Sequence, residues 1–165
     1  MIREAAVNDS ARIAEIEVLS SRYAYRGIVP DDCLYQDLSV ENRAPVYERW
    51  ITEKRFKLYV CEDPGTGEIR GMMGIGPCED DDQEDAFELH FIYVDPGYVG
   101  MGFGSEMLRF FEQQGREKGC LQFVIWVLEE NEKGRKFYEK HSYRSDGKEK
   151  IFKRWNKREI RYVKP

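Results

Sequence analysis

Glycines recur at positions 97, 100, 102 and 104, where an apolar segment ending at Val94 gives way to an amphipathic one. Glycine lets the backbone approach a ligand closely, and the first turn of a helix leaves amide groups without intrahelical partners. Together with the helix dipole, such amides attract phosphate oxygens. The spacing therefore predicts a phosphate-binding turn, although a tightly packed turn that binds nothing could use the same glycines.

The order of these glycines argues against two common nucleotide-binding motifs. No Gly-Lys-Ser/Thr follows the turn, as a P-loop requires. The run G-x-G-x-G, followed by Ser105, matches the dinucleotide fingerprint G-x-G-x-x-G poorly. A nucleotide- or dinucleotide-binding enzyme is therefore a weak alternative.

The other residues capable of metal or nucleophile chemistry are dispersed along the chain. The four cysteines form no C-x-x-C pair, and the two histidines, His90 and His141, lie far apart in the sequence. We therefore predict neither a metal site nor a disulfide framework. No Cys or Ser forms an activated pair with a histidine, so no covalent intermediate is expected.

Composition narrows the class of protein. The 165 residues carry 26 Lys and Arg against 31 Asp and Glu, a net charge of −5, so the global basic footprint of a nucleic-acid-binding protein is missing. No apolar run approaches the roughly 18 to 20 residues of a membrane helix, and the N-terminus lacks a signal-peptide pattern. We expect a cytoplasmic protein that forms one domain over residues 1–165, with no nucleic-acid or membrane partner.

The elements that must position the glycine turn follow from hydrophobic periodicity and turn residues. Helices are predicted over 8–23, 39–54, 100–118 and 131–141, with a short one after Asp31. Strands are predicted over 2–5, 57–61, 69–76, 86–94 and 121–128, followed by a hairpin of 147–155 and 158–163. This order predicts an α/β fold in which a central mixed, mostly antiparallel sheet is flanked by helices.

Two motifs resemble the GNAT superfamily of acyl-CoA-dependent N-acyltransferases. The segment Val99-Gly-Met-Gly-Phe-Gly104 is similar to the family signature Q/R-x-x-G-x-G/A, with Val99 in place of Arg or Gln. The segment from Asn131 to Tyr143 resembles N-x-x-A-x-x-F-Y-x-x-x-G-F, with Gly134 in place of Ala. The resemblance implies a single-domain GNAT-like fold and an acetyl-CoA-dependent N-acetyltransferase.

The resemblance also implies where acetyl-CoA, the co-substrate, binds. The family holds it in a gap between the strand before the glycine turn and the strand before the second motif. Backbone amides grip its pantetheine arm and pyrophosphate, and one amide near Tyr93 would stabilise the developing oxyanion. The residues so implied are Ile92, Tyr93, Val94, Val99, Gly100, Met101, Gly102, Phe103, Gly104, Ser105 and Asn131.

Two side chains match catalytic positions of the family. Tyr138 matches the general acid that protonates the departing thiolate, although it could instead be a core aromatic. Glu88 matches the carboxylate that some members use as general base, directly or through water. Residues 88, 90 and 92 are expected to share one strand face, and burial is expected to raise the pKa of Glu88. His90 is the alternative base.

The sequence carries less information about the acceptor, which we predict to be a small-molecule or peptide amine. Tyr25 and Arg26 are the candidate substrate residues, in a segment that resembles A-Y-R-G-I-V/L-P-D of a GNAT subgroup. The acidic loop over 79–85 could attract a cationic amine or be a solvated hairpin tip. The aromatic C-terminal hairpin is a candidate homodimer contact. Direct attack of the amine in a ternary complex is predicted, and a non-catalytic acyl-CoA sensor is the alternative.

Overall fold

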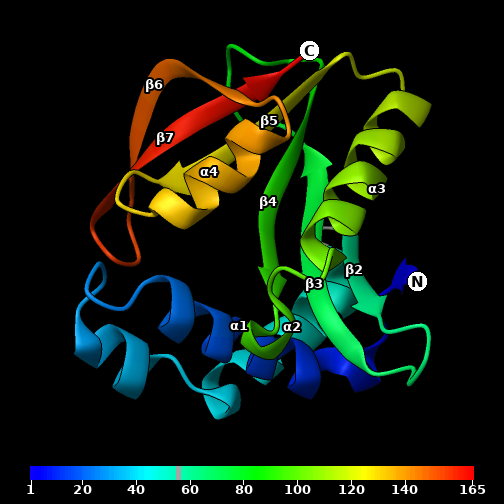
Figure 1. The fold of residues 1–165 in the computed structure, drawn as a ribbon, viewed down its shortest axis with the longest axis vertical. Helices are drawn as coiled ribbons and strands as arrows, with labels where there is room; N and C mark the ends of the chain where they lie inside the picture. The colour runs from blue at the N-terminus through cyan, green and yellow to red at the C-terminus, as the bar shows by residue number, and fades with distance from the viewer. Residues whose placement is uncertain (55–56) are drawn as a thin grey trace.

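A computed structural model describes residues 1–54 and 57–165 (Figure 1). The helices are α1 (Ser10–Ala24), α2 (Val40–Glu53), α3 (Phe103–Glu117) and α4 (Glu132–Lys140), with short helical turns η1 (Val7–Asp9), η2 (Cys33–Asp37) and η3 (Pro96–Tyr98). The strands are β1 (Ile2–Glu4), β2 (Lys57–Glu62), β3 (Ile69–Pro77), β4 (Ala86–Val94), β5 (Gln122–Leu128), β6 (Arg144–Phe152) and β7 (Lys157–Lys164).

The described strands form one sheet in the order β1-β2-β3-β4-β5-β7-β6. Its neighbouring strands pair antiparallel except β4 and β5, which are parallel. The predicted α/β fold, with a mixed and mostly antiparallel sheet flanked by helices, is therefore confirmed. The largest boundary shifts are three positions. The strand β6 begins at Arg144 and ends at Phe152, each three positions before the prediction, and α3 begins at Phe103 rather than at 100.

Two apolar clusters cover opposite faces of the sheet. On the face covered by α3 and α4, called here the α3 face, Phe87 and Phe111 stack with ring centroids 5.4 Å apart. On the face covered by α1 and α2, called here the α1 face, Ile16 and Tyr47 are buried. Fully burying one large apolar side chain contributes about 1.5–3 kcal/mol, so these clusters fix the helices on the sheet.

Helix ends follow local rules. The Ser39 side chain caps α2 by accepting a hydrogen bond of 3.2 Å from the Asn42 amide. Gly119 follows α3 with a φ of 83°, a conformation that glycine adopts without strain. No helix in the described part of the chain is both long enough and apolar enough to cross a membrane.

A β-bulge interrupts β4. Phe91 pairs with Gly74 of β3, but Leu89 pairs with the adjacent residue Ile75, so β4 holds one extra residue, His90. An extra residue changes the phase of the side-chain alternation beyond it.

The bulge makes the expectation that residues 88, 90 and 92 share one face wrong. Ile92 packs against the α3-face cluster, as Phe87 does before the bulge. Glu88 alternates with Phe87 and so lies on the α1 face. A Cβ built on Gly76, which pairs with Glu88, would meet the His90 ring at 3.1 Å, so His90 also lies on that face.

Beyond the bulge, β4 and β5 separate. They pair only from Ala86–Gln122 to Leu89–Ile125. Further along, β4 continues with β3 and β5 continues with β7, and the two strands diverge (Figure 1). The edges of residues 90–94 and 126–128 therefore face each other without a shared ladder, and a gap opens through the sheet.

Candidate active site

A cavity of ≈520 Å³ occupies the gap between β4 and β5. Its walls are β4 beyond the bulge, the end of β5, the glycine turn and α4, with α1 and the C-terminal hairpin on the other side. The sequence-predicted residues that line it are Ile92, Tyr93, Val94, Val99, Gly100, Gly102, Gly104, Ser105, Asn131, Tyr138 and Tyr25. The structure thus brings together residues from four separate predicted segments.

Four predicted residues do not line the cavity. Met101 is 65% exposed and its amide already donates to the Tyr98 carbonyl at 3.2 Å. Phe103 is buried in the α3-face cluster, so only its backbone faces the turn. Arg26 is exposed, and Glu88 reaches the cavity only through its neighbour His90.

The glycine turn presents amides rather than side chains. Gly100 and Gly102 have φ values of 86° and 96°, which L side chains rarely adopt. Helix α3 begins at Phe103 without a side-chain cap, and its first internal bond there runs from the Glu106 amide to the Gly102 carbonyl at 2.9 Å. Among the described residues, the amides of positions 103–105 have no hydrogen-bond partner. They can hold an anion.

Two lysines of α4 line the same cavity, and sequence reasoning missed them. Lys133 and Lys140 of α4 line the cavity, seven residues apart and hence on one helix face. Ser105 shares a hydrogen bond of 3.0 Å with the His141 ring, whose pKa is lowered by burial. The expectation that no Ser pairs with a histidine is therefore wrong. The helical spacing of the two lysines is the signal that could have found them.

Asn131 both caps α4 and lines the cavity. Its side-chain oxygen accepts a hydrogen bond of 3.0 Å from the Gly134 amide. A Cβ on Gly134 would lie 2.6 Å from the side-chain nitrogen Nδ2 of Asn131. The glycine found where the family has alanine therefore gives room for this cap.

Tyr138 lies against the cavity with its ring in the core. Its ring centroid is 5.4 Å from Phe137 and 6.2 Å from Tyr143. Burial raises the pKa of the Tyr138 hydroxyl well above its ordinary value of 10.0. No hydrogen-bond partner for this hydroxyl occurs within residues 1–54 and 57–165. A phenol that keeps its proton and opens into a cavity can act as a proton donor.

Glu88 and His90 form a pair on the α1 face. The Glu88 carboxylate is 3.3 Å from Nδ1 of His90 and accepts a hydrogen bond of 3.2 Å from the Glu79 amide. Burial alone would raise the pKa of Glu88, but the contacts with His90 and the Glu79 amide outweigh it, and the pKa is lowered. The expectation of a raised pKa is therefore wrong. His90, rather than Glu88, is among the residues that line the cavity.

The C-terminal hairpin contributes residues to the α1 side of the cavity that the sequence did not identify. Phe152, Trp155 and Glu159 of the C-terminal hairpin line it. Burial, followed by the charge of Glu159, raises the pKa of the Tyr25 phenol to about 12. The alternation along the hairpin gives no signal of which face meets the gap, so sequence reasoning could not select these three residues.

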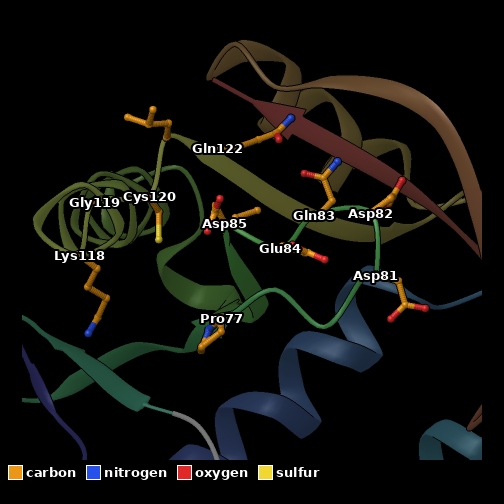
Figure 2. A pocket seen from close by; sticks show the side chains of 12 residues that line it. Pro77, Asp81, Asp82, Gln83, Glu84, Asp85, Lys118, Gly119, Cys120 and Gln122 are labelled. Atoms are coloured by element: carbon orange, nitrogen blue, oxygen red, sulfur yellow. The ribbon is translucent and has the colours of Figure 1, made fainter.

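A second and larger hollow lies at the acidic loop and contains none of the predicted site residues. It has a volume of ≈950 Å³ and is lined by residues 77, 81–86 and 118–122 (Figure 2). Two loop carboxylates, Asp80 and Asp82, hold the buried Arg161 at 3.0 and 2.6 Å, so part of the loop has a structural role. Within the described residues, no group of three or more metal-ligating side chains could hold a metal ion.

Comparison with known proteins identifies similar sequences. The acetyltransferase (GNAT) family model matches residues 22–143. The uncharacterized N-acetyltransferase YuaI of Bacillus subtilis (strain 168) is 26% identical over 130 residues, covering 79% of this chain and 72% of that protein. The thialysine N-epsilon-acetyltransferase of Sus scrofa is 40% identical over 50 residues, covering 30% of this chain and 29% of that protein.

Solved structures share the fold. The PaiA N-acetyltransferase from Thermoplasma acidophilum, in complex with coenzyme A, superposes with a TM-score of 0.79 at 16% identity, covering 98% of this chain and 96% of that chain. YncA from Salmonella typhimurium, with its cofactor acetyl-CoA, gives 0.68 at 20% identity, covering 99% and 92%. At such identities the likeness concerns the fold.

Proposed function

The chain belongs to the acetyltransferase (GNAT) family and is an acetyl-CoA-dependent N-acetyltransferase, and from this premise we propose that it acetylates a primary amine by direct attack in a ternary complex. One observation carries the proposal. The unshared edge of β4, the free amides at the start of α3 and the Tyr138 side chain all meet in one cavity. We further propose that residues 1–165 form a single domain with this activity.

The cavity suits a cofactor that is anionic at one end and amide-rich in the middle. The amides of 103–105, with Lys140 next to the Ser105 partner His141, would hold the pyrophosphate oxygens. The edge of β4 at 92–94 would bind the pantetheine amides as an added strand does, with Asn131 as a further polar contact. Acetyl-CoA supplies the activated thioester.

Two groups would act on the acetyl group. A backbone amide of β4 near Tyr93 would donate a hydrogen bond to the carbonyl oxygen as negative charge develops there. The Tyr138 hydroxyl would donate its proton to the sulfur as the carbon–sulfur bond breaks. Its partner-free position at the cavity, within the described residues, and its raised pKa support this role.

The acceptor amine must lose a proton before or during attack. We propose that His90 takes it, because this residue lines the cavity and the Glu88 carboxylate lies 3.3 Å from its Nδ1. Glu88 would then act as a positioning residue that orients the ring and stabilises the imidazolium. The direct role for Glu88 expected from the sequence becomes an indirect one in this proposal.

Cysteine positions support direct transfer rather than a covalent acyl-enzyme. None of the four cysteines is part of the cavity lining. Burial raises the pKa of the Cys61 thiol to about 11 and that of Cys78 to about 12, so both stay protonated and weakly nucleophilic near neutral pH.

A screen of primary amines with acetyl-CoA, read out by free thiol, tests the proposal. Amine-dependent thiol release and an acetylated product of matching mass are expected. Acetyl-CoA binding by isothermal titration without release for any amine would favour the sensor alternative. Absence of binding at millimolar acetyl-CoA would reject both.

Homodimerisation through the C-terminal hairpin stays a prediction that sedimentation can test.

A further inference from the structure

Glu159 stands out among the carboxylates on the α1 side of the cavity. It lies on β7, opposite Leu128 of β5 and Lys150 of β6, and lines the cavity while only partly exposed. Throughout the described residues no hydrogen bond or ion pair reaches its side chain. Its strand neighbour Lys150 instead places its ammonium 4.1 Å from the centre of the Trp126 ring.

The buried carboxylates are different, because each is satisfied within the protein. Glu17 contacts Arg43 at 2.6 Å and the Tyr47 hydroxyl at 2.9 Å. Glu88 has His90, as described above. An ionised carboxylate withdrawn from water without a partner is costly, so such a group normally marks a place where a partner arrives.

The surroundings of Glu159 fit a cation. Burial, and the charge of Glu88, raise its pKa above the ordinary value of 4.5, while Lys150 opposes this effect. Three aromatic rings share the same wall: Trp155 lies 5.0 Å from Tyr25 and 5.2 Å from Phe152, centre to centre. A carboxylate beside aromatic faces binds an ammonium group through both charge and cation–π contact.

We propose that Glu159 and the aromatic wall formed by Tyr25, Phe152 and Trp155 bind a second ammonium group of the acceptor, so that the preferred substrates are diamines or longer polyamines. This inference rests on the proposed function. The reacting nitrogen must become neutral to attack, and a carboxylate beside it would hold it protonated. A partner-free carboxylate therefore suits a nitrogen that stays charged throughout the reaction.

A matched pair of acceptors tests the inference. We would measure kcat/KM for 1,5-diaminopentane and for 1-aminopentane with the unmodified protein, with Glu159→Gln and with Glu149→Gln. Glu149, on β6, is half exposed and pairs with Arg158 at 3.5 Å outside the cavity, so it controls for the loss of one charge. The unmodified protein should prefer the diamine by about tenfold or more.

The outcomes separate the two proposals. Glu159→Gln should lower kcat/KM for the diamine by about tenfold, through KM, and leave the monoamine within about twofold, whereas Glu149→Gln should keep the preference. Equal loss for both amines, or no diamine preference in the unmodified protein, would overturn the inference while the acetyltransferase function stands. If neither amine is acetylated, isothermal titration of the diamine decides, and equal affinity of the unmodified protein and Glu159→Gln overturns it.

Discussion

The two sides of the gap between β4 and β5 offer contacts of different kinds. On the α3 face, the contacts proposed for the cofactor are mainly backbone amides, from the free edge of β4 and the first turn of α3. On the α1 face they are side chains, among them His90, Tyr25, Trp155 and Glu159. Backbone amides remain when side chains change, so the first surface tolerates sequence variation that would alter the second.

The two sides also differ in charge. Lys140 lies next to His141, which bonds Ser105 of the glycine turn, whereas Glu159 and the Glu88–His90 pair lie on the α1 face. An anionic cofactor and a cationic acceptor would each meet a surface of opposite sign. On the proposed assignment, one sheet would keep its cofactor site on one face while the acceptor specificity varied on the other.

Tyr138 differs from the cofactor contacts proposed on the α3 face, because its proposed role is chemical and depends on its side chain. Replacing it by Phe keeps the ring packing and removes the proton donor. We expect kcat to fall by about 10²- to 10⁴-fold, the usual contribution of a general acid. Thiol release under saturating substrates measures this effect.

Two further measurements keep this prediction specific. Acetyl-CoA affinity of Tyr138→Phe, measured by isothermal titration, should stay within about twofold, since backbone amides provide the binding contacts. Burial holds the pKa of Tyr138 above 10.0, so this group should cause no loss of kcat with rising pH below that value. An unchanged kcat in Tyr138→Phe would assign the protonation to another group.

Gly102 tests whether the cofactor surface depends on backbone conformation. Valine there would be strained at a φ of 96°, although nothing lies within 4 Å of its Cβ position. Strain of about 1–3 kcal/mol, or a rearranged turn, should weaken acetyl-CoA binding by about 10- to 100-fold. Gly147→Val is the matched control, because Gly147 has a φ of 82°, equally open space and a position outside the cavity. Equal affinity of Gly102→Val and the unmodified protein would contradict the assigned role of the turn.

The geometry of the proposed cofactor side was largely predictable from the sequence, for a physical reason. Glycine spacing reports directly on backbone conformation, and the strand–turn–helix order around Gly100 and Gly102 allows few arrangements. The strands of the sheet and the helices that cover it were also predictable, because hydrophobic periodicity is a local property of the sequence. Even the departure at Val99 leaves the amides in place.

The acceptor side was not predictable, because it depends on contacts between distant segments. Tyr25 meets Trp155 only once the hairpin has folded back beside α1. The side-chain alternation along β4 also differs from the prediction, because no residue type around His90 signals a bulge. One extra residue there turned Ile92 to the face opposite Glu88 and moved the base assignment from the carboxylate to the imidazole.

Glu88 tests whether the acceptor side works through paired side chains. Glu88→Gln preserves shape but cannot stabilise an imidazolium, so kcat/KM for the amine should fall by about tenfold and the acidic limb of its pH profile should shift. Acetyl-CoA affinity should not change. A profile of unchanged shape would show that Glu88 has only a structural role.

The lowered pKa of Glu88 also predicts a pH dependence of stability. A carboxyl group with a folded pKa below its ordinary 4.5 stabilises the fold above that pH and loses this contribution as pH falls through the lowered pKa. Thermal unfolding from pH 7 down to pH 3 should therefore show a smaller acid-induced drop in Tm for Glu88→Gln than for the unmodified protein.

Val99 gives the smallest expected effect and the finest test of the comparison. It is 50% exposed at the cavity, where the family has Arg or Gln. If backbone amides provide most of the pyrophosphate contact, Val99→Arg should tighten acetyl-CoA binding by only about two- to fivefold at low salt, because an exposed ion pair contributes little. The gain should vanish near 1 M salt, where the screening length is about 3 Å.

Val7→Arg, at 46% exposure and outside the cavity, adds the same charge and should leave binding unchanged. A gain of a hundredfold would mean that the side chain at position 99, rather than the amides, dominates pyrophosphate binding.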